Sequence, residues 1–318
     1  MRRFPAVVAA VSLFAIALTG CSSAASTNGS ASCTREQSSS TAATDLVTVT
    51  GEGGSEPNID VRTPVYTSQT EFVDIARGEE GPTLVSDTQA AILDFVLLDG
   101  VTGEVVATTE YASSGNQPAI VSSLYGALPG LEPALECATG GSRVVAVLAS
   151  DDIAPDSAQS LGLGEDEALV AVVDVQKVYL AKAEGTEQFA EGRGLPTVVR
   201  APNGQPGISF PDHDAAVPDA AVSEVVIRGD GAEVAADDSI LVNYTSVDWD
   251  TREVQQTSWG AAPQALDMST VPAEIADALV GQPVGSQVML VVPSDPASGL
   301  EQSLIYIFDI LGIDDFNA

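Results

Sequence analysis

The chain has 318 residues, of which 45 are Asp or Glu and only 12 are Lys or Arg, so its formal net charge is −33. A surface with this charge repels nucleic acid and anionic lipid, which argues against both as binding partners. The single histidine, His213, lies in a loop rich in Pro and Asp, where we expect it to be solvated. Its isolation excludes hydrolysis by a His-based triad. The spaced motifs of metal and phosphate sites are absent from the sequence, so we expect no metal and no cofactor.

The N-terminus has the pattern of a secretory signal, which we assign to residues 1–20. Two arginines precede an apolar run from Phe4 to Leu18, which is shorter than the about 20 residues of a membrane-spanning helix. The run ends in Leu-Thr-Gly-Cys, which resembles a bacterial lipobox and implies that Cys21 is lipidated and becomes the new N-terminus. The alternative is an ordinary cleaved signal followed by a chance cysteine.

Residues 21–44 are rich in Ser, Ala and Thr and show no periodicity, which predicts a disordered tether between the lipid and the folded part. The expected location is therefore the cell membrane, with the protein lipid-anchored on the extracytoplasmic face.

Two cysteines remain once Cys21 carries lipid. Cys33 lies in the predicted tether and Cys137 follows a predicted helix. Outside the cytoplasm a leftover pair indicates a disulfide, so we predict a Cys33–Cys137 bond that pins the tether to the first folded domain. Two free thiols are the alternative.

Taken in order, the folded part contains an internal repeat. The segment 73–106 parallels 224–254, the segment 127–148 parallels 270–292, and the strand 169–178 parallels 304–313. In this alignment Phe95 matches Tyr244, Leu135 matches Leu279 and Asp174 matches Asp309. We therefore predict two domains of one design, at 45–183 and 207–313. The Gly-, Pro- and Glu-rich segment 184–206 is expected to be an exposed linker, and 314–318 a short tail.

The second repeat shows the predicted elements most clearly. Alternating apolar residues at 239–246 predict a strand, and a polar segment follows. Residues 271–286 predict one short helix, because Ile275, Ala278 and Leu279 fall on one face and Gly281 provides a stop. Two hydrophobic strands at 287–293 and 304–311 complete the repeat.

This order of elements resembles the FKBP-type peptidyl-prolyl cis-trans isomerases. The matching segments are VIRGDGAEVAADDSI (226–240), VNYTS (242–246), TSW (257–259), ALVGQPVGS (278–286) and IFDIL (307–311). The resemblance implies an α+β fold with two FKBP-like domains, each a curved antiparallel sheet wrapped on one short helix. In that family the substrate pocket lies between the helix and the sheet.

The resemblance places a substrate pocket in each domain. In the second domain Tyr244 matches the family's strand tyrosine, and Val271 and Pro272 take the place of a Val-Ile pair. The other pocket positions hold Gln255, Gln256, Ile275 and Tyr306, the last where the family has a phenylalanine. Gln255 and Gln256 replace a Phe-Asp pair, Ile275 replaces the tryptophan floor, and the flap tyrosine falls near Ser298.

In the first domain the corresponding residues are Phe95, Val106, Leu128 and Leu131. Leu128 retains a backbone N–H that could hold the substrate carbonyl, whereas Pro272 has none, so the first domain is the favoured place for residual catalysis.

The function that the resemblance implies is prolyl isomerisation, which breaks no covalent bond and needs an apolar cradle for the proline ring. We expect an extracytoplasmic FKBP-type isomerase that assists the folding of secreted proteins, with proline-containing unfolded or secreted polypeptides as partners. One alternative is a catalytically weak or inactive FKBP-like chaperone or binding lipoprotein. Another is a purely structural envelope protein.

Overall fold

The computed structural model describes residue 33 and residues 40–78, 81–111, 117–189, 194–210, 215–296 and 299–314. The predicted signal sequence, Cys21, His213 and Ser298 lie outside these residues. Within them, no helix has the length and apolar character needed to cross a bilayer.

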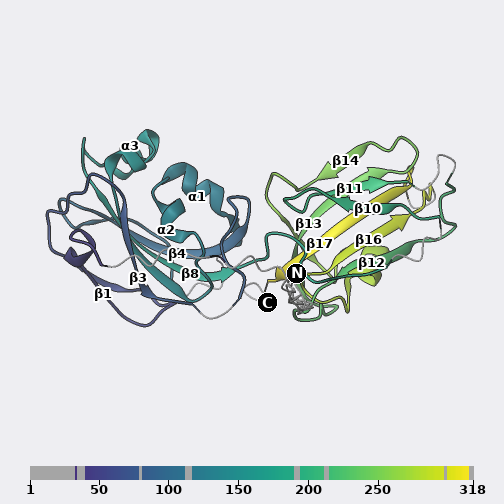
Figure 1. Ribbon diagram of the computed structural model, residues 1–318, viewed down its shortest axis with the longest axis horizontal. Helices are drawn as coiled ribbons and strands as arrows, with labels where there is room; N and C mark the ends of the chain where they lie inside the picture. Colours follow the sequence, from purple (N-terminus) through teal and green to yellow (C-terminus); the bar gives the residue numbers. More distant parts are fainter. Residues whose placement is uncertain are drawn as a thin grey trace, which may run out of the picture.

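Two antiparallel sheets form the body of the protein, and the helices are few and short (Figure 1). The first is a six-stranded sheet with the order β3-β7-β8-β4-β5, in which β6 also pairs with β4. Its strands are β3 (Glu71–Ala76), β4 (Ala90–Asp99), β5 (Val105–Thr108), β6 (Ala119–Ile120), β7 (Ser142–Leu148) and β8 (Leu169–Val178). We refer to residues 40–183 as the first half.

The second is a seven-stranded sheet with the order β14-β13-β17-β16-β12-β9, in which β15 also pairs with β13. Its strands are β9 (Thr186–Glu187), β12 (Val222–Arg228), β13 (Ser239–Asp248), β14 (Val254–Thr257), β15 (Gln264–Asp267), β16 (Gln287–Val292) and β17 (Leu304–Ile313). We refer to residues 184–314 as the second half.

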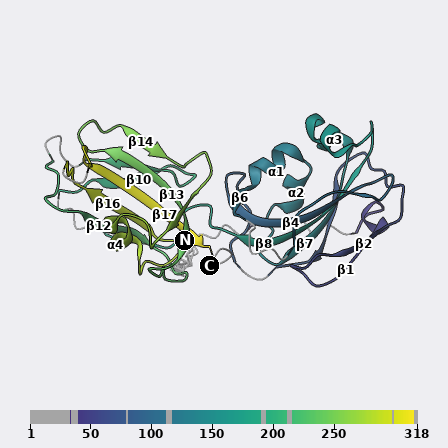
Figure 2. The ribbon, with the colours of Figure 1, turned by 180° about the vertical axis from the view of Figure 1, so that it is seen from behind.

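Each sheet is covered on both faces, which explains why its central strands are buried along most of their length. One face, the helix face, packs on helices: α1 (Val121–Ala127) and α2 (Leu131–Leu135) in the first half and α4 (Ala273–Leu279) in the second. The other, the hairpin face, lies under a two-stranded hairpin. The hairpins are β1 (Val47–Thr50) with β2 (Asn58–Val61), and β10 (Thr197–Arg200) with β11 (Pro206–Ser209). Figures 1 and 2 show the helices and the β1–β2 hairpin on opposite sides of the first sheet.

The repeat is reproduced in the strand register. Phe95 pairs with Val173 in the first sheet, and Tyr244 pairs with Phe308 at the equivalent place in the second. Side chains repeat as well, because Thr109 Oγ1 accepts a hydrogen bond from Phe95 N–H and Ser258 Oγ accepts one from Tyr244 N–H, both at 2.9 Å. The two halves therefore share one design down to individual hydrogen bonds.

The prediction of one short helix per repeat is wrong for the first half. It contains α1, α2 and a third helix, α3 (Pro155–Leu161). α3 has the local signals of a helix, with Pro155 at its first position and Gly162 in the left-handed conformation after its end. In the second half α4 ends at Leu279, well before residue 286, and Gly281 has a φ of +81°.

The segment 184–206, predicted as an exposed linker, is instead part of the second half as far as it is described. β9 pairs with β12, and β10 pairs with β11 over the hairpin face. β10 is the counterpart of β1, so a Gly- and Pro-rich composition here reflects a partly exposed hairpin. The ends of the predicted tether and tail are also packed, since Ala43, Thr44 and Asp314 are buried.

The two halves contact each other directly. Tyr179 and Leu180, at the end of the first half, pack with Leu241 and Leu311 of the second sheet. Lys177 Nζ donates a hydrogen bond to the carbonyl of Ile313 at 2.7 Å. In the first half, Cys33 and Cys137 form a disulfide with Cα atoms 5.5 Å apart, which joins residues 104 positions apart in the sequence.

Candidate functional site

The helix face of the second sheet carries a partly open aromatic surface. Tyr306 stacks on Phe308 with ring centroids 5.6 Å apart, and Tyr244 lies 6.2 Å from the same ring. Phe308 is buried, whereas the two tyrosines are half-buried. We call these three residues the aromatic cluster. It is large, apolar and accessible at its edge, as a binding surface for a small ring would need to be.

Two residues at the start of α4 border the same core. Ile275 and Val271 are half-buried and pack against the hydrophobic cluster that contains Phe308. Pro272 directly precedes α4 and is exposed, and its carbonyl accepts hydrogen bonds from Ile275 and Ala276 N–H. Because proline has no N–H, this helix start cannot donate a hydrogen bond from that position.

Hydrogen-bond donors are nevertheless present beside the cluster. The Tyr244 hydroxyl donates to Gln256 Oε1 at 3.0 Å, which fixes the amide oxygen and leaves the amide nitrogen as a donor. Burial, together with the neighbouring Tyr244, raises the pKa of Tyr306, so its hydroxyl stays protonated at neutral pH. Gln255 lies on the same strand, β14, and is exposed.

The corresponding region of the first half is filled by its own side chains. Leu131 has no exposed surface and Leu128 is 3% exposed. Phe95 and Val106 are half-buried and pack against the same hydrophobic cluster. The N–H of Leu128 donates to Leu124 O at 2.8 Å, because α1 ends there. The expectation that this N–H could hold a substrate was therefore wrong, and the reason is a helix that the sequence reading missed.

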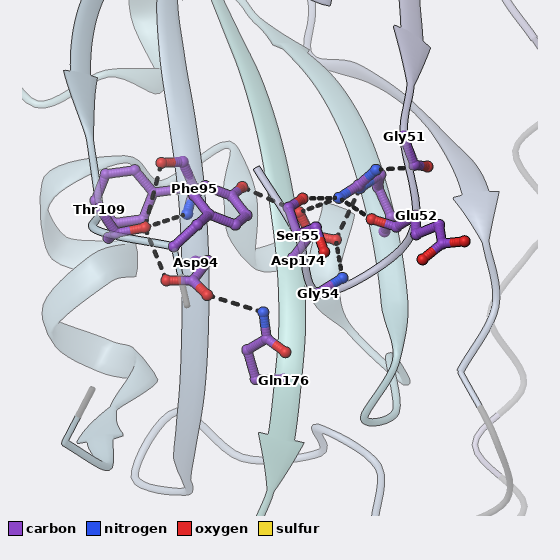
Figure 3. A network of polar contacts seen from close by, with 11 residues as sticks. Gly51, Glu52, Gly54, Ser55, Asp94, Phe95, Thr109, Asp174 and Gln176 are labelled. Atoms are coloured by element: carbon purple, nitrogen blue, oxygen red, sulfur yellow. Dashed lines mark hydrogen bonds and ion pairs between the residues drawn. The ribbon is translucent and has the colours of Figure 1, made fainter. Parts of the chain in front are cut away.

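A buried polar network lies on the hairpin face of the first sheet (Figure 3). Arg143 forms a two-pronged ion pair with Asp174, in which Nε lies 2.7 Å from Oδ1 and Nη2 lies 3.0 Å from Oδ2. Its guanidinium also donates to the carbonyls of Gly51, Glu52 and Ser55 in the turn between β1 and β2. Every polar group in this network has a partner, so its role is to fasten the hairpin to the sheet.

The second sheet has a carboxylate at the equivalent place but lacks the arginine. Gln287 replaces Arg143, and its Nε2 donates to Asp309 Oδ1 at 2.7 Å. The other oxygen of Asp309 accepts from Ala183 N–H at 2.8 Å, and Arg200 donates to Gln287 Oε1 at 3.2 Å. Burial raises the pKa of Asp309 to about 6, against the lowering effect of these hydrogen bonds and of the Arg200 and Lys182 charges.

No group of three or more metal-ligating side chains occurs among the residues that the structure describes. What the second half presents beside α4 is an aromatic surface with side-chain hydrogen-bond donors at its edge.

No known protein-family profile matches the sequence, and no curated protein matches it. Solved structures that it resembles include FKBP-type isomerases and multi-domain FKBPs. The three FKBP domains of wheat FKBP73 are 12% identical with a TM-score of 0.32, over 77% of this chain and 94% of that one.

A putative peptidyl-prolyl cis-trans isomerase, FKBP12 from Mycobacterium tuberculosis, is 20% identical with a TM-score of 0.23, over 33% of this chain and 92% of that one. FkpA from Escherichia coli is 19% identical with a TM-score of 0.28; the match covers 39% of this chain and 54% of FkpA.

Substituting Arg143 tests the polar network. Arg143→Gln copies the second half but leaves the turn carbonyls without donors, and we expect the free energy of unfolding to fall by about 3 kcal/mol. Arg77→Gln is the matched control, because the Arg77 side chain is 62% exposed and its Nε lies 3.8 Å from Asp74 Oδ2. This substitution should change the free energy of unfolding by less than about 0.5 kcal/mol. Equal effects in urea unfolding would contradict a structural role for the buried pair.

The raised pKa of Asp309 predicts an unusual dependence of stability on pH. In the unfolded chain the pKa of this carboxyl is near its ordinary value of 3.8, and in the folded protein burial raises it to about 6. Between these two pKa values the folded state holds a proton that the unfolded state has lost. The free energy of unfolding therefore falls as the pH rises from about 4 to about 7, and this group accounts for about 3 kcal/mol of the loss. The stability advantage of Asp309→Asn over the wild type should grow across the same interval. Parallel profiles of the two proteins would show that Asp309 titrates normally.

Alanine substitutions should distinguish the filled region from the open one. Leu131→Ala creates a cavity in the first half and should lower the free energy of unfolding by about 3 kcal/mol. Ile275→Ala, at the equivalent and half-buried position of the second half, should cost only about 1 kcal/mol. A cost at Ile275 as large as that at Leu131 would mean that the second half is equally closed.

Proposed function

We propose that this protein is an FKBP-like peptidyl-prolyl cis-trans isomerase whose substrate-binding surface is the helix face of the second half. The observation that carries the proposal is the half-open aromatic cluster of Tyr244, Tyr306 and Phe308 beside α4. The order of elements supports it, because β13, α4, β16 and β17 follow one another as they do in the family that the sequence resembles.

Catalysis at this surface would rest on burial rather than on covalent chemistry. A proline ring placed against Tyr306 and Ile275 would exclude water from the preceding amide and favour its twisted, less resonant state. The barrier to be lowered is about 18–20 kcal/mol. The Tyr306 hydroxyl and the Gln256 amide nitrogen are the side-chain donors beside the cluster that could hold the substrate carbonyl. Ile275 offers less contact area than a tryptophan, so we expect modest rates.

The proposed setting is the extracytoplasmic face of the cell membrane, with a lipid anchor at Cys21. Its support is the lipobox-like Leu-Thr-Gly-Cys sequence and the two cysteines available for a disulfide, which suits an oxidising compartment. The substrates would then be proline-containing segments of secreted polypeptides during folding.

A second candidate function is binding without turnover. Pro272 favours it, since the residue at the position where the family offers a backbone donor has no N–H here. In that case the same surface would hold unfolded chains as a chaperone, and a holdase assay would detect the protein while an isomerase assay would not.

Isomerase assays on a series of proline tetrapeptides, with the full extracytoplasmic chain, test the proposal. Tyr306→Ala should lower kcat/KM by about tenfold, because the ring contact and the hydroxyl donor are both lost. Phe95→Ala removes a half-buried aromatic ring from the helix face of the first half, serves as the control, and should leave the rate unchanged.

An effect of Phe95→Ala equal to that of Tyr306→Ala would move the activity away from the second half. Absence of any acceleration by the wild type would remove the enzymatic proposal and leave the binding function.

A further inference from the structure

A groove of about 340 Å³ lies between β10 and β12 of the second half. Its walls are Leu195 and Val198 on one side and Val226 on the other, and the buried Met289 of β16 lies beneath them. The groove is on the hairpin face, whereas the aromatic cluster is on the helix face. The two surfaces are therefore separate.

Phe189 stands at one end of this groove with a fully exposed ring. It follows β9, and the N–H of the preceding Gln188 donates to Val226 O at 2.8 Å, which anchors the backbone next to it. An aromatic side chain on an anchored backbone can cover a partner at little cost in conformational entropy. Exposed aromatic residues of this kind are enriched among those that dominate binding interfaces.

Glu224 supplies an unsatisfied charge in the same groove. Its Oε2 atom is buried and has no hydrogen-bond partner. Arg200, the cation that lines the groove, is already paired with Glu187 and bonded to Gln287. A buried carboxylate oxygen without a donor is costly, so a ligand that brings a donor to Glu224 gains the free energy of that interaction.

The backbone beside the groove can receive an extended chain. Among the described residues, β12 pairs along its outer side with β9 only at Ile227 and Arg228. The rest of that edge, from Val222 to Val225, has no strand partner in the described part of the chain. Free edges of this type accept an additional strand.

We propose that the β10–β12 groove binds an extended polypeptide segment that presents a lysine or arginine to Glu224 and an apolar side chain between Phe189 and Val198. The net charge of −33 attracts a basic segment and repels both a second copy of this chain and an anionic membrane. This site does not depend on isomerase activity, because it lies on the other face of the sheet.

Fluorescence anisotropy with a labelled peptide of alternating lysine and valine, in about 0.15 M salt, tests the proposal. We expect Glu224→Gln to weaken binding by about tenfold and Phe189→Ser to weaken it severalfold. Glu253→Gln removes the same charge from an exposed site of the second half and should leave binding unchanged. A peptide with glutamate in place of lysine should not bind.

Three results would overturn the proposal. Equal losses in Glu224→Gln and Glu253→Gln would show non-specific attraction to an acidic surface. Loss of binding in Tyr306→Ala would place the peptide on the aromatic cluster. Val198→Trp fills the groove without changing its charge and should abolish binding. A folded Val198→Trp variant that still binds the peptide would contradict the proposal.

Discussion

The structure depends on the long antiparallel pairs at the centre of each sheet, β4 with β8 and β13 with β17, and on the equivalent carboxylates that they bury near their middle, Asp174 and Asp309. A buried charge must be given hydrogen bonds or a counter-ion, or the sheet loses more free energy than its apolar contacts provide. The first half solves this with Arg143, which also holds the β1–β2 turn. The second half uses the Gln287 amide and the backbone N–H of Ala183. The two halves therefore satisfy equivalent buried carboxylates with different hydrogen-bond partners.

A similar divergence separates the two helix faces. In the first half α1 and the leucines of the α2 region pack over the sheet, and Leu128 and Leu131 are buried there. In the second half a single short helix leaves Tyr244 and Tyr306 half-buried, and the hydroxyl of Tyr244 is held by Gln256. The accessible edge of the two tyrosines is the surface on which the proposed function rests. This difference explains why we assign the proposed function to one half alone.

Much of this arrangement could be predicted from the sequence. The alternation of apolar residues located the long strands, and the matched segments gave the repeat in the register that the structure shows, with Asp174 and Asp309 at the same place. Residues 121–127 were missed as a helix because Ser and Gly weaken the local propensity, and packing of Val121 and Leu124 on the sheet overrides it. The hairpin at 197–209 was mistaken in part for a linker, since Gly and Pro serve turns and linkers alike. Which leucine N–H groups are already bonded could not be read from residue types, since that depends on where a helix ends.

The bond from Ala183 to Asp309 has a consequence for how the protein can be divided. Ala183 lies in the first half, after β8, yet its N–H donates a hydrogen bond to the Asp309 carboxylate in the second sheet. A fragment that starts at the β10–β11 hairpin lacks Ala183, so one oxygen of Asp309 would lose its hydrogen-bond donor. It also lacks Tyr179 and Leu180, so Leu241 and Leu311 would be exposed to solvent. The second half therefore depends on the first for a hydrogen bond and for apolar cover, so the two halves form one structural unit.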